Sequence, residues 1–326
     1  MIWDPEFVPP PAPPNHATIR YRRWSVLSRR VSRSPDVVRA ITAELVAASD
    51  GRLVDLLPLP LTSTSLLLGG RWDGQAVIAK VHITSDELFW NRLAEERSPG
   101  LFARLLLSGE RLRGQAVNWL VVERLPVPLG PSWRGKQWWM VADAAARFQQ
   151  LASTAPSERA HVEGPETIER WLHCAAGRNC PIDLTALVEN VESDWAYVAR
   201  VCPPTICFGD LHLGNAFARE PPPTSTRAVL IDPIPRIQPW LFDAAYCEAN
   251  SADSGVGLCA TLAETRAAIG LGSSHGPEFL EASALMLGWM ATLWWGIRGF
   301  RRGDSRWERH ATQLMANAVG RRGRVA

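Results

Sequence analysis

The sequence predicts a two-lobed α+β protein with a small strand-rich first lobe and a larger helical second lobe. Short apolar runs separated by turn residues fill residues 53–83, which is typical of strands. Beyond Pro128, apolar side chains recur mostly at helical spacing. A proline-containing stretch at 123–131 lies between these parts and reads as a hinge. We therefore expect a cleft at this linker, where two-lobed proteins commonly bind ligands.

The first lobe is expected to cover residues 17–122, after a proline-rich arm at 1–16 that favours extended backbone. A basic stretch at 20–33 reads as a solvated helix face, with an anionic partner as the alternative. Asp36 can help to cap a helix over 36–48. The pattern then predicts strands at 53–59, 65–68, 76–81 and 117–122, a turn at 69–74 and a helix at 85–97.

The second lobe is expected to cover residues 132–326 and to be mostly helical. Apolar spacing predicts helices at 136–151, 166–176, 183–200, 257–269 and 277–300. A short island with strands at 205–217 and 227–231 interrupts them.

The composition excludes several classes of protein. The chain has 326 residues, 46% of them hydrophobic and 21% charged, as in globular proteins. Its net charge of +2 gives no global basic field for nucleic acid. The six cysteines show no C-x-x-C pair or zinc spacing and read as reduced thiols. No signal peptide is seen, and the apolar run at 282–295 is too short to span a bilayer. We expect a cytoplasmic monomer or homodimer with no membrane partner.

Residues 206–215 and 229–232 carry the pattern that points to chemistry. Asp210 and Asn215 have the D-x-x-x-x-N spacing of protein kinases, and Asp232 ends a short apolar strand. Asp210 alone reads equally well as an Asx turn. The whole string is much harder to obtain by chance, and it predicts phosphoryl transfer, in which carboxylates orient a hydroxyl and bind magnesium.

The string resembles a motif of the aminoglycoside phosphotransferase family, which has a protein-kinase-like fold. Residues 209–215 (G-D-L-H-L-G-N) are similar to its H-G-D-L-H-x-G-N loop. Residues 231–233 (I-D-P) resemble the streptomycin-type and hydroxyurea-type resistance kinases, and 243–246 (D-A-A-Y) resemble the family's Y-D-x-A. Phe208 stands where the family usually has histidine, so we expect altered packing of the loop.

The resemblance implies a role for each matching residue. It implies Asp210 as the base or orienting carboxylate, Asn215 and Asp232 as ligands of Mg²⁺, Asp243 as a brace of the loop, and His212 beside the nucleotide.

The first lobe offers partners for a nucleotide. Lys80 ends a V-I-A-K run close to the V-A-I-K of kinases, where the lysine neutralises the α- and β-phosphates, although an isolated strand-end lysine is usually solvated. We expect Glu87 to hold it, with Glu95 and Glu96 as alternatives. The turn at 62–65 lacks the kinase glycines, but its hydroxyls and amides could meet phosphate oxygens. Its residues are Thr62, Ser63, Thr64 and Ser65.

The remaining contacts concern the base and the acceptor. Residues 121–125 resemble the family's hinge, which implies that backbone groups of Glu123 and Leu125 bind the base. Glu248 and Asp253 could attract a cationic acceptor, and Trp289 could stack on a sugar or base. The alternatives are surface charges and core packing.

Together these observations predict a small-molecule kinase that uses Mg²⁺ and ATP or GTP. Its acceptor would be a hydroxyl of an antibiotic or sugar-like compound, of aminoglycoside or nucleoside type. The alternative is a nucleotide-binding pseudokinase or regulatory module, which Phe208 and the poor phosphate loop favour.

Overall fold

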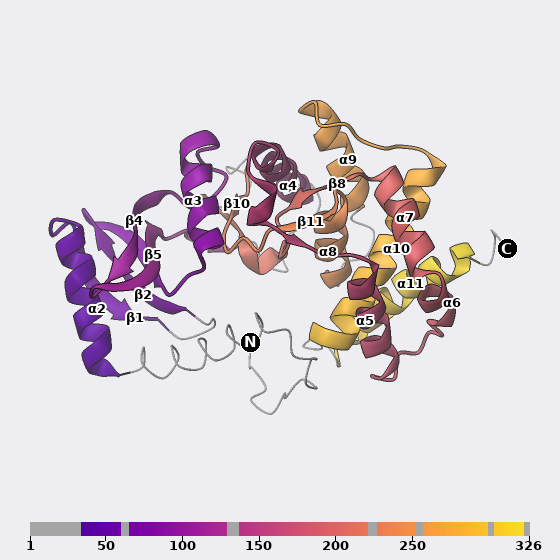
Figure 1. The fold of residues 1–326 in the computed structure, drawn as a ribbon, viewed down its shortest axis with the longest axis horizontal. Coiled ribbons are helices and arrows are strands. Elements are labelled where there is room, and N and C mark those ends of the chain that lie inside the picture. Colours follow the sequence, from indigo (N-terminus) through magenta and orange to yellow (C-terminus); the bar gives the residue numbers. More distant parts are fainter. Residues whose placement is uncertain are drawn as a thin grey trace. The chain divides into compact units, whose positions relative to one another are not determined.

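The computed structural model has a strand-rich unit and a helical unit, which confirms the expected α+β class (Figure 1). By their contacts, the described residues up to Thr84 group with Leu106–Glu123, and Ser85–Leu105 groups with the chain from Arg124 onward. The helix at 85–97, which the sequence division assigned to the first lobe, is thus part of the second unit. The proline-rich arm lies outside the described residues, which are 34–59, 65–128, 137–220, 227–251, 257–298 and 303–322.

The first unit is a five-stranded antiparallel sheet of order β1-β2-β3-β5-β4 with one helix packed on it (Figure 1). Helix α2 (Pro35–Ala48) buries Ile41 and Leu45 against the sheet, and these side chains share a hydrophobic core with the strands. The strands are β1 (Leu53–Pro58), β2 (Leu66–Trp72), β3 (Gln75–Val81), β4 (Leu105–Leu112) and β5 (Gln115–Glu123).

One hairpin turn in this sheet uses the left-handed conformation at two successive residues. Asp73 and Gly74 have φ angles of 48° and 84°, which suits the two-residue turn between β2 and β3. The turn expected over 69–74 is therefore too long, because Gly69 and Gly70 pair with β3 as part of the strand. Strand β4 was not predicted, since most of its side chains are half-buried and do not alternate between buried and exposed.

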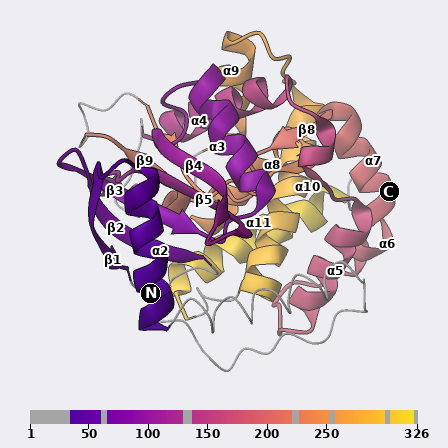
Figure 2. The ribbon, with the colours of Figure 1, turned by 60° about the vertical axis from the view of Figure 1, so that its left-hand side comes forward.

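The second unit is built around helix α10, which contacts α5, α7, α8 and α11 (Figure 2). Helix α10 continues into a π-helical turn, Trp294–Arg298, which modifies the helix expected over 277–300. Within the described part of the chain, no helix is long and apolar enough to cross a membrane. The helices are α3 (Ser85–Arg97), α4 (Gln137–Ala152), α5 (Pro165–Ala176), α6 (Thr185–Glu189), α7 (Val191–Val201), α8 (Phe242–Asn250), α9 (Leu258–Ala268), α10 (Pro277–Leu293) and α11 (Ser305–Arg322).

Several of these helices differ from the expectation. The helix expected over 183–200 is divided at Asn190 into α6 and α7. Helices α8 and α11 were not predicted at all. All nine residues of α8 are buried, so it has no polar face to mark it as a helix.

Two small three-stranded sheets frame the segment with the kinase-like pattern. One has the order β10-β9-β6 and the other β7-β11-β8, and a 3-10 turn, Leu213–Asn215, lies just before β9. Their strands are β6 (Val127–Pro128), β7 (His161–Val162), β8 (Pro204–Cys207), β9 (Ala216–Ala218), β10 (Val229–Leu230) and β11 (Arg236–Pro239).

Candidate active site

The loop after β8 is held by hydrogen bonds within itself and to the segment before β11. Its 3-10 turn is capped by His212, whose Nδ1 accepts a hydrogen bond of 2.9 Å from the backbone N–H of Gly214. Gly209 has a φ of +87°, and a Cβ there would lie 1.8 Å from the carbonyl oxygen of Ile234. The loop therefore requires glycine at this position, both for conformation and for space.

Asp243 on α8 braces the start of this loop. Its two carboxylate oxygens accept hydrogen bonds from the backbone N–H groups of Phe208 and Gly209, at 2.7 and 2.8 Å. The side chain is completely buried, and burial raises the pKa of Asp243 to about 6, while the two backbone hydrogen bonds act to lower it. This geometry corresponds to the bracing role that the resemblance implied.

Asp210 is surrounded by three polar side chains. The hydroxyl of Tyr246 donates a hydrogen bond of 2.6 Å to Oδ1 of Asp210. Asn215 donates from Nδ2 to Oδ2 of Asp210 at 3.2 Å and to its carbonyl at 3.0 Å. Nε2 of His212 lies 3.8 Å from Oδ2. These contacts fix the Asp210 carboxylate. Its side chain is 15% exposed, so a ligand can still reach it.

Tyr246 was not among the predicted site residues, although it belongs to the D-A-A-Y string that resembles the family motif. The signal was its position three residues after Asp243 on one helix, because residues at that spacing share a face. Since helix α8 was not predicted, this relation could not be recognised.

A backbone hydrogen bond joins the segment before Asp232 to Asn215. The N–H of Ile231 donates to the carbonyl of Asn215 at 3.0 Å, which brings the following residue, Asp232, beside the loop. Since Nδ2 of Asn215 donates to Asp210, its amide oxygen is the atom that a cation would contact. One carboxylate and one amide oxygen suit Mg²⁺, which takes its other ligands from water and phosphates. Across the described residues, no group of three His, Cys, Asp or Glu side chains could hold a metal.

Phe208 packs where the related loops usually have histidine. Its side chain is fully buried, and its ring centroid lies 5.5 Å from that of Phe148 and 6.1 Å from that of Phe102. Phe148 in turn lies 5.2 Å from the ring of Trp90 on α3. The side chain thus fills an aromatic cluster, while the backbone N–H and C=O of Phe208 bond to Asp243 and Ile234.

Two nucleotide-site candidates of the first unit, Lys80 and Ser65, are buried. Lys80 on β3 is only 8% exposed, so it is not a solvated strand-end lysine. Ser65 is also buried, and its hydroxyl lies 3.4 Å from the carbonyl of His82. Glu123 ends β5, opposite Val77 of β3. The other turn residues, Thr62, Ser63 and Thr64, lie outside the described part of the chain.

Three glutamates were candidates for holding Lys80. Glu87 is partly exposed in the first turn of α3, and its carbonyl accepts a hydrogen bond of 2.8 Å from Asn91. Glu95 accepts from the N–H of Leu105 at 2.9 Å, and Glu96 is exposed. The pairing of Lys80 with Glu87 stays a prediction, as do the base contacts of Glu123 and of the buried Leu125.

The proposed acceptor residues lie in different surroundings. Trp289 is completely buried on α10, and its ring centroid lies 6.3 Å from that of Trp195. Core packing therefore describes it better than stacking on an acceptor. Asp253 lies outside the described residues. Glu248 is 7% exposed and accepts a hydrogen bond of 3.3 Å from the N–H of Cys259, in the first turn of α9.

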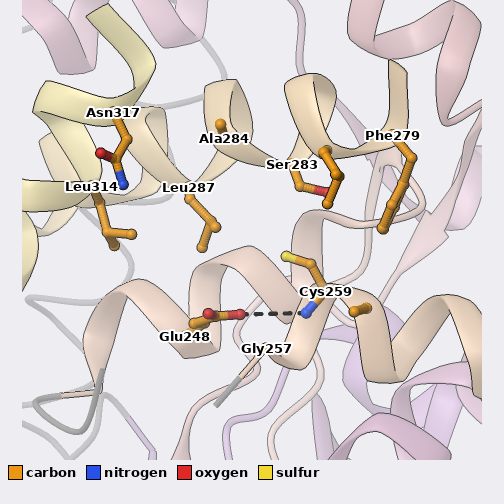
Figure 3. A pocket seen from close by; sticks show the side chains of 11 residues that line it. Glu248, Gly257, Cys259, Phe279, Ser283, Ala284, Leu287, Leu314 and Asn317 are labelled. Carbon is orange, nitrogen blue, oxygen red and sulfur yellow. Dashed lines mark hydrogen bonds between the residues drawn. The ribbon is translucent and has the colours of Figure 1, made fainter. Parts of the chain in front are cut away.

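Glu248 also lines a pocket of about 200 Å³ between α8, α9, α10 and α11 (Figure 3). Apolar side chains of α10 and α11, among them Leu287 and Leu314, form much of its wall. Helical geometry places Glu248 about 200° around α8 from Tyr246. The pocket therefore faces a different side of α8 from the side that holds Asp210, and burial raises the pKa of Glu248 above its usual range.

Comparison with known proteins identifies the fold. No protein-family model matches the sequence, and no curated protein matches it significantly. The chain is similar to APH(2")-IIia in complex with GDP and kanamycin, at 14% identity over 86% of this chain and 98% of that one, with a TM-score of 0.55. It is similar to an aminoglycoside phosphotransferase from Alicyclobacillus acidocaldarius (13% identity, 85% and 92% covered, TM-score 0.52). A choline/ethanolamine kinase family protein from Mesorhizobium loti shows 12% identity, 91% and 94% coverage and a TM-score of 0.52. The kinase-like fold that the loop motif implied is thereby confirmed.

Proposed function

We propose that this chain, which has the fold of aminoglycoside phosphotransferases, is a small-molecule kinase. The observation that supports this most is the arrangement around Asp210, where one loop and helix α8 join a carboxylate, an amide and a buried brace. Phosphoryl transfer depends mainly on positioning and on electrostatic stabilisation. A carboxylate held by Tyr246 and Asn215 is suited to orient an attacking hydroxyl.

In the proposed reaction, Asp210 accepts a hydrogen bond from the acceptor hydroxyl and then its proton. A bond forms between the acceptor oxygen and the γ-phosphorus, and the bond from that phosphorus to the β–γ bridging oxygen breaks. The products are a phosphorylated acceptor and a nucleoside diphosphate. Asp243 contributes indirectly, because it fixes the backbone of the two residues before Asp210.

Magnesium and nucleotide would be held by residues that the kinase pattern assigns. Asn215 and Asp232 would bind Mg²⁺, which when bound neutralises charge on the phosphates. Lys80 would contact the α- and β-phosphates, with Glu87 holding its ammonium, and His212 would lie beside the nucleotide. Backbone groups of the hinge would bind the base.

The acceptor that we propose is a hydroxylated antibiotic or a sugar-like compound. Support comes from the relatives of the fold, one of which was solved with kanamycin. The choline/ethanolamine kinase family relative keeps smaller amino alcohols in the test panel. A pseudokinase would have the same fold. The buried Phe208 of this chain does not favour that alternative over a kinase, since the backbone N–H of Phe208 still donates its hydrogen bond to Asp243.

The decisive experiment measures nucleotide turnover and acceptor mass with ATP or GTP, Mg²⁺ and a panel of aminoglycosides, nucleoside antibiotics and amino alcohols. Transfer adds one phosphoryl group to an acceptor. Asp210→Ala should lower kcat by about 10²–10⁴-fold, the usual contribution of a positioned base. Asp36→Ala is the control, since that carboxylate on α2 is 81% exposed.

Two other outcomes would change the assignment. Nucleotide binding by thermal shift with no transfer to any acceptor would favour the pseudokinase. Turnover by Asp210→Ala at the parent rate would show that another group orients the hydroxyl.

A further inference from the structure

Helix α8 directs a buried tyrosine at the carboxylate of Asp210. The Tyr246 side chain is 1% exposed, and its hydroxyl lies 2.6 Å from Oδ1 of Asp210. A neutral phenol donates to a carboxylate, and such charge-assisted hydrogen bonds are short and strong. The residues are 36 positions apart in the chain, so the contact exists only in the folded protein.

The ring of Tyr246 is held in one orientation by its neighbours. Phe242 stacks on it with ring centroids 5.8 Å apart, and the ring of Trp294 lies 4.8 Å away. The indole N–H of Trp294 also donates to the carbonyl of Tyr246 at 3.1 Å. Trp294 begins the π-helical turn that follows α10, and such turns are frequent at functional sites.

Asp210 is thereby held through both carboxylate oxygens. Tyr246 contacts Oδ1 from α8, and Asn215 contacts Oδ2 from within the loop. Asn215 is the proposed magnesium ligand, so its contact with Asp210 can change when a cation binds. The contact from Tyr246 comes from a buried helix that contributes no proposed metal ligand.

We propose that Tyr246 is a positioning residue that fixes the Asp210 carboxylate for the acceptor hydroxyl. This inference rests on the proposed kinase function. Tyr246 has no contact with nucleotide or acceptor in this assignment and acts through Asp210 alone. Its removal should therefore reduce the rate of transfer and leave binding of both substrates nearly unchanged.

The test is Tyr246→Phe, which removes one hydroxyl and keeps the buried ring. We expect kcat to fall about 10- to 100-fold, the range that corresponds to loss of a hydrogen bond to a charged group. The KM for the acceptor should change less than about twofold. Tyr197→Phe is the matched control, because Tyr197 on α7 also donates a hydrogen bond to a carboxylate, at 3.0 Å to Glu281 on α10, and neither residue belongs to the proposed site.

A double-mutant cycle separates positioning from a general structural effect. In the Asp210→Ala background, Tyr246→Phe should cause no further loss of kcat. An unchanged kcat in the single variant would overturn the proposal, and so would an equal loss in both backgrounds.

A second cycle needs no turnover and keeps the inference separate from the proposed function. The shifts in urea midpoint that Tyr246→Phe and Asp210→Ala cause should not add up in the double variant, since each substitution removes the same Tyr246–Asp210 hydrogen bond. If the parent transfers phosphate to nothing, the kinase assignment fails, and with it the role of Tyr246. Additive midpoints would instead refute the Tyr246–Asp210 contact.

Discussion

Gly209 offers the sharpest test of how the loop is built, because substitution by alanine meets two separate obstacles. The first is the backbone, since a Cβ at a φ of +87° costs about 1–2 kcal/mol. The second is space, since that Cβ would lie 1.8 Å from the carbonyl oxygen of Ile234. Only movement of the backbone can relieve such a contact.

The movement would weaken two hydrogen bonds that now fix the loop. One joins the N–H of Ile234 to the carbonyl of Phe208 at 3.1 Å, and the other joins the N–H of Gly209 to Asp243 at 2.8 Å. At about 1 kcal/mol for each bond, Gly209→Ala should lower the free energy of unfolding by about 3–4 kcal/mol in total.

Gly270→Ala provides the matched control within the same unit. Its φ is +78°, and a Cβ added there would meet no atom within 4 Å, so only the backbone cost of about 1–2 kcal/mol applies. Equilibrium unfolding in urea of both variants gives the difference. If Gly209→Ala were no more destabilising than Gly270→Ala, the close approach to Ile234 would be refuted.

Two further predictions concern Asp243, which braces the loop, and Lys80, the proposed phosphate contact. Because the pKa of Asp243 is about 6 when folded and 3.8 ordinarily, the native state keeps a proton that the unfolded chain loses between about pH 4 and 6. The free energy of unfolding should thus fall by about 3 kcal/mol as the pH rises through that window, and Asp243→Asn should remove this slope in urea titrations at pH 4 and pH 7. If the parent and Asp243→Asn showed the same dependence of unfolding free energy on pH, burial of Asp243 would not be what raises its pKa. For the proposed nucleotide site, Lys80→Ala should weaken nucleotide binding or turnover strongly and Glu87→Ala less, and the double variant should resemble Lys80→Ala; additive losses would separate the two residues.

Local patterns were sufficient to predict the fold class and many elements. Helix α2 was expected over 36–48 and spans Pro35–Ala48, because its apolar side chains lie on one face. Helix α11 carried the same kind of signal, since Trp307, Ala311, Leu314 and Ala318 are buried at helical spacing. That helix was overlooked, whereas α8 could not have been found by periodicity, because every one of its residues is buried.

The candidate site could be predicted only in part, because some of its contacts depend on how helices pack in the folded chain. Asp210, Asn215 and Asp232 follow from short strings, because their spacing along the chain is the signal. The contact of Tyr246 with Asp210 depends on how α8 packs against the loop. Likewise, the burial of Trp289 depends on neighbours such as Trp195 on another helix. The burial of Trp289 leaves no trace in local sequence, and the three-residue spacing of Asp243 and Tyr246 becomes a signal only once α8 is known to be a helix.

The aromatic cluster around Phe208 has a consequence for how the proposed kinase could be regulated. It links α3 through Trp90 and Phe148 to Phe208, the residue that precedes Gly209. Protein kinases are switched by displacing the helix that carries the lysine's glutamate partner. Helix α3, which carries the proposed partner Glu87, is anchored by the fully buried Trp90, so moving the helix outward would expose part of the core. For the proposed kinase, this packing leaves no outward-displaced inactive position of α3, so its activity would be controlled by the amount of protein and by the supply of its ligands.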